Sequence, residues 1–331
     1  MSFNRRSLLS AGMALAGVAL AHISSSSRAQ SAIDLSDVTL RVGDQTGATR
    51  AKFEAAGLLD DVPYTIDWSV HAAAVNLHEA LKAGAIDIGS AADSPTVSAI
   101  AGASRIKAVA GWSNGGKGRF ILVPQDSPIG SLEDLAGRTL SPTTRGSVAH
   151  YLVVGALKKA GLTTDEVTLA FLSPVDATAA LSAGSIDAWG TWGVYAARAI
   201  GQGARILLSG EGINSGLLVL SATDDALTDP GKTAAIADFA DRLDRAYAWS
   251  SQDKNAWVDF YATFSKQDEK LVDVLYEDER AYARVPVDDA FVSELQRTYD
   301  TWVEAEVLPD RGLDLGAYVY RDLATSRGEH E

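Results

Sequence analysis

The sequence predicts an α/β protein made of two lobes of similar construction. Short apolar runs alternate with helical patterns from residue 38 to residue 220, the order that gives mixed or parallel sheets flanked by helices. In addition, residues 80–87 (ALKAGAID) recur 100 positions later as residues 180–187 (ALSAGSID), with six of eight positions identical. Each copy closes a helix on Gly and enters a strand, so the repeat predicts two αβ lobes with a ligand cleft between them.

In the first lobe the expected strands are apolar runs bounded by turn residues, at 38–43, 64–68, 86–89 and 106–112. The expected helices are 48–57, 71–83 and 93–101. Gly57 and Gly84 close the first two, because Gly adopts the left-handed C-cap without steric cost. The third opens with a capping residue followed by Pro95, which suits the first helical position.

The pattern restarts near residue 131. Strands are expected at 139–140, 167–172 and 186–189, and helices at 147–160 and 176–183. Two further strands, near 119–123 and 216–221, are expected to cross between the lobes as a hinge. Residues 234–250, 254–264, 268–283 and 288–304 have helical spacing and form a tail that we expect over the first lobe. The predicted division is 30–123 with 215–331 for the first lobe and 124–214 for the second.

Residues 1–29 are predicted to be an export signal. Residues 4–9 (NRRSLL) are typical of the twin-arginine type, with the Sec route as the alternative, and an apolar, small-residue stretch covers 11–21. We expect cleavage near Ala29 and a location in the periplasm. The apolar stretch is too short for a membrane anchor, so no membrane insertion is expected.

The composition excludes several classes of function. The chain has no cysteine, which excludes disulfides and a lipid on a cleaved N-terminal Cys. Without residues 1–29 it has 26 basic and 43 acidic residues, a net charge of −17. That balance argues against nucleic acid or an anionic membrane as partner, but local donors still allow a small anionic ligand. No metal site or cofactor is predicted, because no zinc motif is present.

Four corners where a strand meets a helix are expected to face the cleft. Helix starts carry unpaired N–H groups and the positive end of the helix dipole, so they suit sulfonate, phosphate, nitrate or carboxylate groups. Ordinary helix capping is the alternative for each corner. After the repeated strand of the second lobe, two tryptophans are candidates to cover an organic group, with core packing as the alternative. The candidate residues are Gln45, Thr46, His71, Asp93, Ser94, Arg145, Gly146, Ser147, Val148, Trp189 and Trp192.

These segments resemble the periplasmic substrate-binding proteins of ABC importers for aliphatic sulfonates, nitrate and taurine, most of all the sulfonate branch. The resemblance rests on residues 80–87, 123–129 (VPQDSPI), 145–151 (RGSVAHY), 172–177 (LSPVDA) and 186–189, in family order over about 38–325. It implies two lobes that close around the ligand, an inner-membrane permease as partner, a monomer, and no catalytic residues. It also implies that Gln45, Asp93, Ser94, Gly146 and Ser147 hold the anionic head group.

The chain departs from the family at the organic end of the ligand. Where the family often has Trp-Asp-Pro-Tyr, residues 192–195 are WGVY, and residues 114–119 (NGGKGR) are an unusual approach to the first crossing strand. Small residues at Ala72 or Gly193 would make room for more than a short alkyl chain. Arg145, Lys117 and Arg119 are open candidates to neutralise the head group, with solvated surface as the alternative for each.

Other functions remain open from the sequence. A pyrimidine-precursor binder would need aromatic rings on both faces of a planar ligand, such as Trp68 and Trp112 facing Trp189. A nitrate or taurine binder, a ligand-sensing module, and a periplasmic enzyme are further alternatives; for the enzyme, Ser147 and His150 are three apart on one helix, a spacing that rarely makes a nucleophile–base pair. The prediction is a binding protein for an organosulfonate or a sulfate ester.

Overall fold

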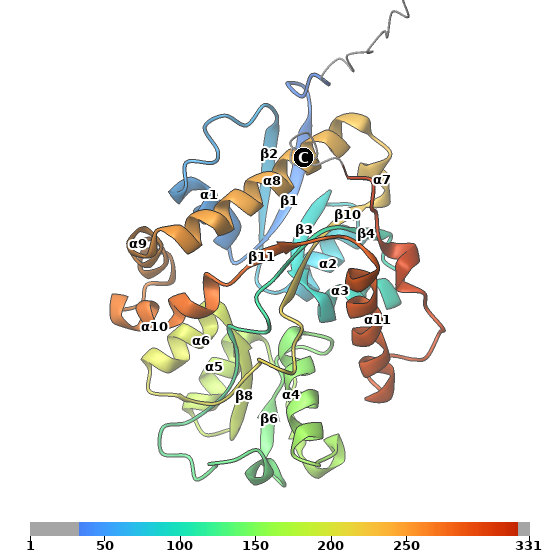
Figure 1. Cartoon of the computed structure of the whole chain (residues 1–331). Coiled ribbons are helices and arrows are strands. Elements are labelled where there is room, and N and C mark those ends of the chain that lie inside the picture. Colours follow the sequence, from blue (N-terminus) through green and yellow to red (C-terminus); the bar gives the residue numbers. More distant parts are fainter. Residues whose placement is uncertain (1–32, 324–331) are drawn as a thin grey trace, which may run out of the picture. The chain divides into compact units, whose positions relative to one another are not determined.

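The strands of the protein form two mixed sheets in a computed structural model that describes residues 33–323, apart from the side chains of residues 274, 278 and 279 (Figure 1). The first sheet has the strand order β11-β4-β10-β3-β1-β2. β1 runs parallel to β2 and β3, whereas β10 runs antiparallel to β3 and β4. The bounds are β1 (Thr39–Gln45), β2 (Thr65–His71), β3 (Ile88–Ala92), β4 (Ile106–Ser113), β10 (Leu217–Thr223) and β11 (Ala283–Val285).

The second sheet has the order β7-β6-β8-β5-β9. β6 is parallel to β7 and β8, and β5 is antiparallel to β8 and β9. The bounds are β5 (Arg119–Val123), β6 (Thr139–Ser141), β7 (Thr168–Leu169), β8 (Ala188–Trp192) and β9 (Arg205–Ser209). The order β7-β6-β8-β5-β9 repeats β2-β1-β3-β10-β4 strand for strand, which confirms two α/β sheets built alike.

Helices flank both sheets (Figure 1). They are α1 (Ala48–Ala55), α2 (Ala74–Lys82), α3 (Asp93–Ala101), α4 (Val148–Lys159), α5 (Pro174–Ser182), α6 (Gly193–Gly201), α7 (Asp224–Leu227), α8 (Pro230–Gln252), α9 (Lys254–Ser265), α10 (Glu269–Glu279) and α11 (Asp289–Glu304). None of the helices within residues 33–323 combines the length and apolar character that crossing a membrane requires. The predicted export signal at 1–29 lies outside the described residues.

The repeated sequence makes the same contact in both sheets. Asp87 donates its N–H to the Arg41 carbonyl at 2.8 Å, and its carboxylate accepts the Arg41 N–H at 2.9 Å. Asp187 exchanges the same two bonds with Thr139, at 2.7 and 2.8 Å. Each aspartate therefore fastens the entry of β3 or β8 to the neighbouring strand. Asp87 also forms ion pairs with Arg41 and Lys232, at 2.6 and 2.8 Å.

The chain passes between the sheets through two glycine-rich segments, residues 114–118 and 210–216, whereas we expected the crossing within strands. β5 and β10 each lie wholly in one sheet. The two segments run beside each other, and Asn114 donates its N–H to the Gly216 carbonyl at 3.3 Å. Gly116 has φ +90°, and a Cβ there would lie 2.6 Å from the Asn214 carbonyl oxygen. Glycine is thus required for this close approach.

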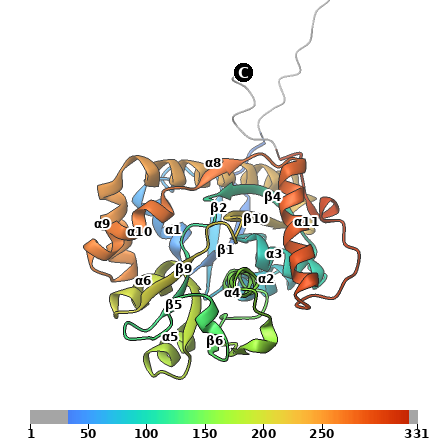
Figure 2. The same cartoon turned by 60° about the horizontal axis from the view of Figure 1, so that its bottom comes forward.

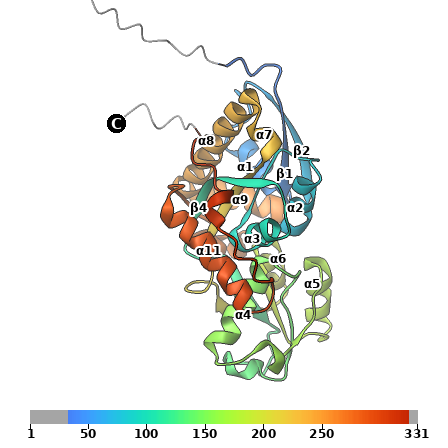
Figure 3. The same cartoon turned by 90° about the vertical axis from the view of Figure 1, so that its right-hand side faces the viewer.

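The helical tail packs on both sheets, whereas the sequence led us to expect it over the first lobe. Phe239 of α8 lies in the core of the first sheet. α9 and α10 lie beside α6 of the second sheet (Figure 2), and Trp257 of α9 and Tyr276 of α10 share a core with Trp189 of β8. The chain then returns to the first sheet at β11, and α11 lies beside α3 (Figure 3). Trp302 of α11 packs edge to face on Tyr151 of α4, with their ring centres 5.2 Å apart. The reason is length: the 23 residues of α8 extend roughly 35 Å, enough to carry the chain across.

The bounds of two strands that lead to the site differ from the prediction. β3 and β8 begin two residues later than expected and run on to Ala92 and Trp192. The elements α6, β9 and β11 were not predicted. α6 opens with Gly193 and has no capping side chain, so its start lacks the usual sequence mark.

Candidate ligand-binding site

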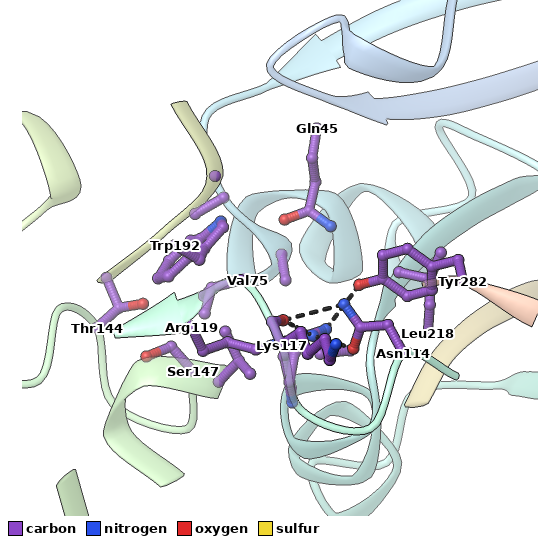
Figure 4. Close-up of a pocket in the computed structure, with 17 residues that line it drawn as sticks. Gln45, Val75, Asn114, Lys117, Arg119, Thr144, Ser147, Trp192, Leu218 and Tyr282 are labelled. Carbon is purple, nitrogen blue, oxygen red and sulfur yellow. Dashed lines mark hydrogen bonds between the residues drawn. The ribbon is translucent and has the colours of Figure 1, made fainter. Parts of the chain in front are cut away.

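A cavity of about 120 Å³ lies between the two sheets (Figure 4). Its walls come from both lobes and from the first crossing segment. They include Gln45, Ala73, Ala74, Val75, Ala92, Pro95 and Leu218 from the first sheet and its helices, Thr144, Ser147, Val148, Trp192 and Gly193 from the second, and Asn114, Lys117, Gly118, Arg119 and Tyr282.

The starts of four helices meet at this cavity. α2, α3 and α6 begin there without any side-chain cap, at N-cap residues Ala73, Ala92 and Trp192. α4 differs, because the Ser147 hydroxyl accepts the N–H of His150. A helix start leaves its first N–H groups without acceptors in the helix, and it carries a partial positive charge. Their convergence makes the cavity favourable for an anion.

Arg119 supplies a full positive charge in the cavity wall. It is the first residue of β5 and is 6% exposed. One terminal nitrogen donates to Asn114 Oδ1 at 2.6 Å and to the Lys117 carbonyl at 2.5 Å. The other donates to the Tyr282 hydroxyl at 2.8 Å (Figure 4).

These three acceptors hold the guanidinium in place but do not neutralise it. Among the side chains that the structure describes, no carboxylate forms an ion pair with Arg119. Arg stays protonated in proteins, and a buried cation without a counter-charge is costly. The cavity therefore has a strong electrostatic preference for an anionic ligand.

Thr144 adds a hydroxyl to the same wall. Its Oγ1 is buried and has no hydrogen-bond partner among the residues that the structure describes, although the residue lines the cavity. Buried hydroxyl groups are normally bonded, so this oxygen is suited to a ligand.

A second cavity of about 180 Å³ adjoins the first. The two share Gln45, Trp192, Gly193, Leu218 and Tyr282. The second is lined by aromatic side chains of α6, α8 and α9 together with Thr46, Thr49, Lys52 and Ser90. The sequence indicated room for a larger organic group at Gly193, but it did not predict the aromatic wall, because part of that wall comes from the tail, which has no local motif for a ligand.

Five of the candidate residues lie at the two cavities. Gln45, Ser147, Val148 and Trp192 line the first, and Thr46 lines the second. The Gln45 amide donates to the Ser90 carbonyl at 2.8 Å, which orients its side chain. The Ser147 hydroxyl is already bonded to Thr143 Oγ1 at 2.8 Å, to the Pro142 carbonyl at 3.1 Å and to the His150 N–H. Ser147 thus serves the helix start.

The tryptophan of the repeated strand lies elsewhere. Trp189 is fully buried in the core shared with α9 and α10, and it lines neither cavity. Since β8 runs to residue 192, Trp189 is inside the strand, and Trp192 occupies its carboxyl end. Of the two candidate tryptophans, Trp192 alone reaches the cleft.

Asp93 and Ser94 are buried and hold α3 to its surroundings. The Asp93 carboxylate accepts from Ser215 Oγ at 2.6 Å and Thr298 Oγ1 at 3.0 Å. The Ser94 carbonyl accepts from the Trp302 indole at 3.2 Å. Both residues thus connect α3 to the second crossing segment and to α11, outside the lining of the two cavities.

His71, Arg145 and Gly146 also lie outside the lining of both cavities. His71 Nε2 lies 3.0 Å from Ser69 Oγ, and burial lowers the pKa of its ring. The Arg145 guanidinium is exposed and sits 4.6 Å from the centre of the Phe171 ring. A Cβ on Gly146 would lie 2.8 Å from Ser98 Oγ, so this glycine allows α3 and α4 to approach each other.

Asn114, Thr144 and Tyr282 are site residues that the sequence did not predict, and Arg119 was only an open candidate to neutralise the head group, with solvated surface as the alternative. The usable signal was the NGGKGR segment at 114–119, which was interpreted as an unusual approach to the first crossing strand and not as part of the site. Its glycines have φ of +69°, +90° and +74°, which turns the chain so that Arg119 enters the cavity wall.

The geometry gives little support to the enzyme or to the pyrimidine-precursor binder that the sequence left open. His150 Nδ1 accepts the Gly146 N–H at 3.1 Å, and burial, with the charge of Arg145, lowers its pKa to about 4. Within the described part of the chain, no cluster of three His, Cys, Asp or Glu side chains could hold a metal. Trp112 and Trp189 are buried in separate cores and do not face each other across the cleft.

Comparison with known proteins identifies relatives over more than half of the chain. The family described as "ABC transporter, phosphonate, periplasmic substrate-binding protein" matches residues 55–241. A protein of Escherichia coli (strain K12) that is named for binding aliphatic sulfonates is 34% identical over 201 residues. That match covers 60% of this chain and 63% of the E. coli protein, so about a third of the relative's length is unmatched.

Solved structures share the fold over nearly their whole length. The alkanesulfonate-binding protein SsuA from Xanthomonas axonopodis pv. citri, bound to MOPS, has a TM-score of 0.75 at 26% identity, covering 86% of this chain and 98% of that one. SsuA from Escherichia coli has a TM-score of 0.72 at 26% identity, covering 88% and 95%. The desulfurization enzyme DSZB, at 15% identity and a TM-score of 0.55, is similar in fold alone.

Proposed function

The chain belongs to the family of periplasmic substrate-binding proteins of phosphonate-type ABC transporters, and on that premise we propose that it captures an organic sulfonate or sulfate ester for import. The family resemblance drawn from the sequence is confirmed. The ligand class is the proposal, and relatives named for sulfonates support it.

One observation carries the proposal: Arg119 is buried in the wall of the cleft without a carboxylate partner in the described residues. A sulfonate or sulfate is fully ionised at neutral pH, and its oxygens accept from a guanidinium in the paired geometry that suits Arg. The uncapped starts of α2, α3 and α6 also favour an anionic ligand.

The second cavity supports an organic ligand over nitrate. Nitrate would leave about 180 Å³ of aromatic-lined space unfilled. An organic sulfonate fills both parts, with its charged end beside Arg119 and its organic end toward Trp192.

Closure of the lobes follows from the position of the cavity. A ligand that contacts both lobes binds the closed form more tightly than the open form, and so it shifts the population toward closure. Tyr195 of α6 already donates its hydroxyl to the Ala72 carbonyl of the first lobe at 2.8 Å. This bond spans the cleft and adds to the closed state.

The remaining parts of the proposal concern the setting of the protein. We propose that residues 1–29 direct export, by the twin-arginine route and with cleavage near Ala29, into the periplasm. There the chain acts as a monomer, with lobes at 30–123 plus 215–331 and at 124–214, and delivers its ligand to an inner-membrane ABC permease. It binds its ligand without transforming it.

A thermal-shift panel tests the ligand class. The purified protein is heated with ethanesulfonate, benzenesulfonate, methyl sulfate, taurine, nitrate, methylphosphonate and orotate. A ligand at 100 times its Kd stabilises the folded state by about 2.7 kcal/mol, which raises the midpoint by several degrees. A shift with a sulfonate or a sulfate ester is expected. A shift with orotate or nitrate, and none with any sulfur oxyanion, would refute the proposal.

A further inference from the structure

The second cavity continues the anion site without a break. The two cavities meet at Trp192 and Gly193, the last residue of β8 and the first of α6. Gly193 has φ +53°, and a Cβ placed on it would meet no atom within 4 Å. The junction is therefore open, and a ligand can extend from one cavity into the other.

Aromatic rings from the tail form the far wall of the second cavity. Tyr247 comes from α8, and Phe260 and Tyr261 come from α9. Tyr247 and Tyr282 lie 4.9 Å apart with their rings tilted by 34°, and Trp192 and Tyr195 lie 6.0 Å apart at 83°. Rings at such angles offer both edges and faces, the arrangement in which a further aromatic ring packs well.

The volume of the second cavity matches one aromatic ring. It measures about 180 Å³. An apolar cavity of about 150 Å³ is large enough to bind benzene. A two-carbon chain would leave most of this space empty, and its walls would lose those contacts.

A ring face in the second cavity is already occupied by a cation. Lys52 lines the cavity, and its ammonium group lies 4.6 Å from the centre of the Tyr247 ring. It thus occupies a ring face that could otherwise attract a ligand's ammonium group. An uncharged organic group does not depend on that face.

We propose that the protein selects anions whose organic part is an uncharged aromatic ring, over short alkyl anions and over zwitterions that carry an ammonium group. The inference rests on the proposed function, because the ligand's aromatic ring contacts the second cavity while Arg119 binds its anionic end. Helices α8 and α9 are then specificity elements as well as packing elements.

Calorimetric titration of the purified protein with three probes tests the inference. Benzenesulfonate, ethanesulfonate and taurine have the same sulfonate group and differ in the organic end. Benzenesulfonate is expected to bind at least about tenfold more tightly than ethanesulfonate, a difference of about 1.4 kcal/mol, and taurine less tightly than ethanesulfonate. Equal or tighter binding of ethanesulfonate overturns the aromatic preference. If none of these sulfonates binds, this inference fails together with the sulfonate part of the proposed function; if methyl sulfate binds in the same assay, the proposed function stands without this inference.

Two variants locate the preference in the second cavity. Phe260→Ala removes a ring of the cavity wall, so the preference for benzenesulfonate over ethanesulfonate is expected to fall to about threefold or less. Phe264→Ala is the matched control, because Phe264 stacks on Phe260 from the same helix at 5.9 Å and lies outside the cavity lining. The control is expected to keep the tenfold preference. A preference that survives Phe260→Ala, or that both variants lose equally, overturns the assignment of this wall.

Discussion

The charge of Arg119 can be removed while most of its shape is kept, by the substitution Arg119→Gln. Glutamine is uncharged and retains an amide that can donate to Asn114 or Tyr282, which accept from the guanidinium at 2.6 and 2.8 Å. The ligand then loses its counter-charge in a setting where the native side chain is 6% exposed.

The expected loss of affinity is large because the pair is shielded from water. Removing one partner of a buried, hydrogen-bonded charge pair costs about 2–5 kcal/mol. At about 1.4 kcal/mol for each factor of ten, Kd for ethanesulfonate should rise by roughly 30-fold to more than 1,000-fold. Added salt should change the wild-type affinity little, since buried pairs are weakly screened.

The assay is calorimetric titration of wild type, Arg119→Gln and the matched control Arg145→Gln. Arg145 is an exposed arginine just before the start of α4, and it lies outside the lining of both cavities. Its variant should bind within about threefold of wild type. The reasoning is refuted if Arg119→Gln also binds within threefold, or if Arg145→Gln shows the larger loss.

Three further predictions concern closure, pH and the hinge. Tyr195→Phe loses one hydrogen bond across the cleft, so Kd should rise about two- to tenfold by calorimetry, and unchanged affinity would mean that the bond is absent in solution. Although burial raises the pKa of Asp87, hydrogen bonds from its cationic partners lower it overall, so its stabilisation is present at neutral pH and is lost as pH falls through the lowered value. In urea unfolding, Asp87→Asn should lower the free energy of unfolding by about 2 kcal/mol at pH 7 and by less at pH 3. Asp187→Asn should lower it by less than Asp87→Asn does at pH 7, and equal losses for the two variants would contradict this. Gly116→Ala should lower the thermal midpoint more than Gly115→Ala, because both have positive φ but a Cβ meets backbone atoms only at the former, and the reverse order would exclude a steric origin.

The sequence was sufficient for the lobes because their pattern is local. Alternating strands and helices, glycine C-caps and the repeated ALxAGxID segment depend on neighbours in the chain, and both sheets formed from the predicted strands, with β9 and β11 as unpredicted additions. The aspartates of the repeat make the same backbone bonds in each sheet. Such contacts follow from the register of neighbouring strands, and a repeated sequence places the same residue at the same position of that register.

The site was predicted less well because it depends on where strands end and on distant packing. A shift of two residues in β8 moves Trp189 into the core and Trp192 to the cleft. Arg119 looks like a surface residue in a glycine-rich turn, and only the turn's positive φ angles bring it into the wall. Tyr282 reaches the cavity from a segment more than 160 positions later in the chain.

The passage of the tail from one sheet to the other has a mechanical consequence. Residues 114–118 and 210–216 connect the lobes, the junction of α8 and α9 at Asp253 is a third connection, and the return from α10 to β11 is a fourth. α8 is anchored in one core and α9 in the other, so any opening of the lobes must also separate Tyr247 from Phe260 and Tyr261. The compartment that holds the organic group is therefore assembled only on closure. A ligand that fills it holds all four connections in one geometry, and a ligand that leaves it empty would let the lobes reopen sooner.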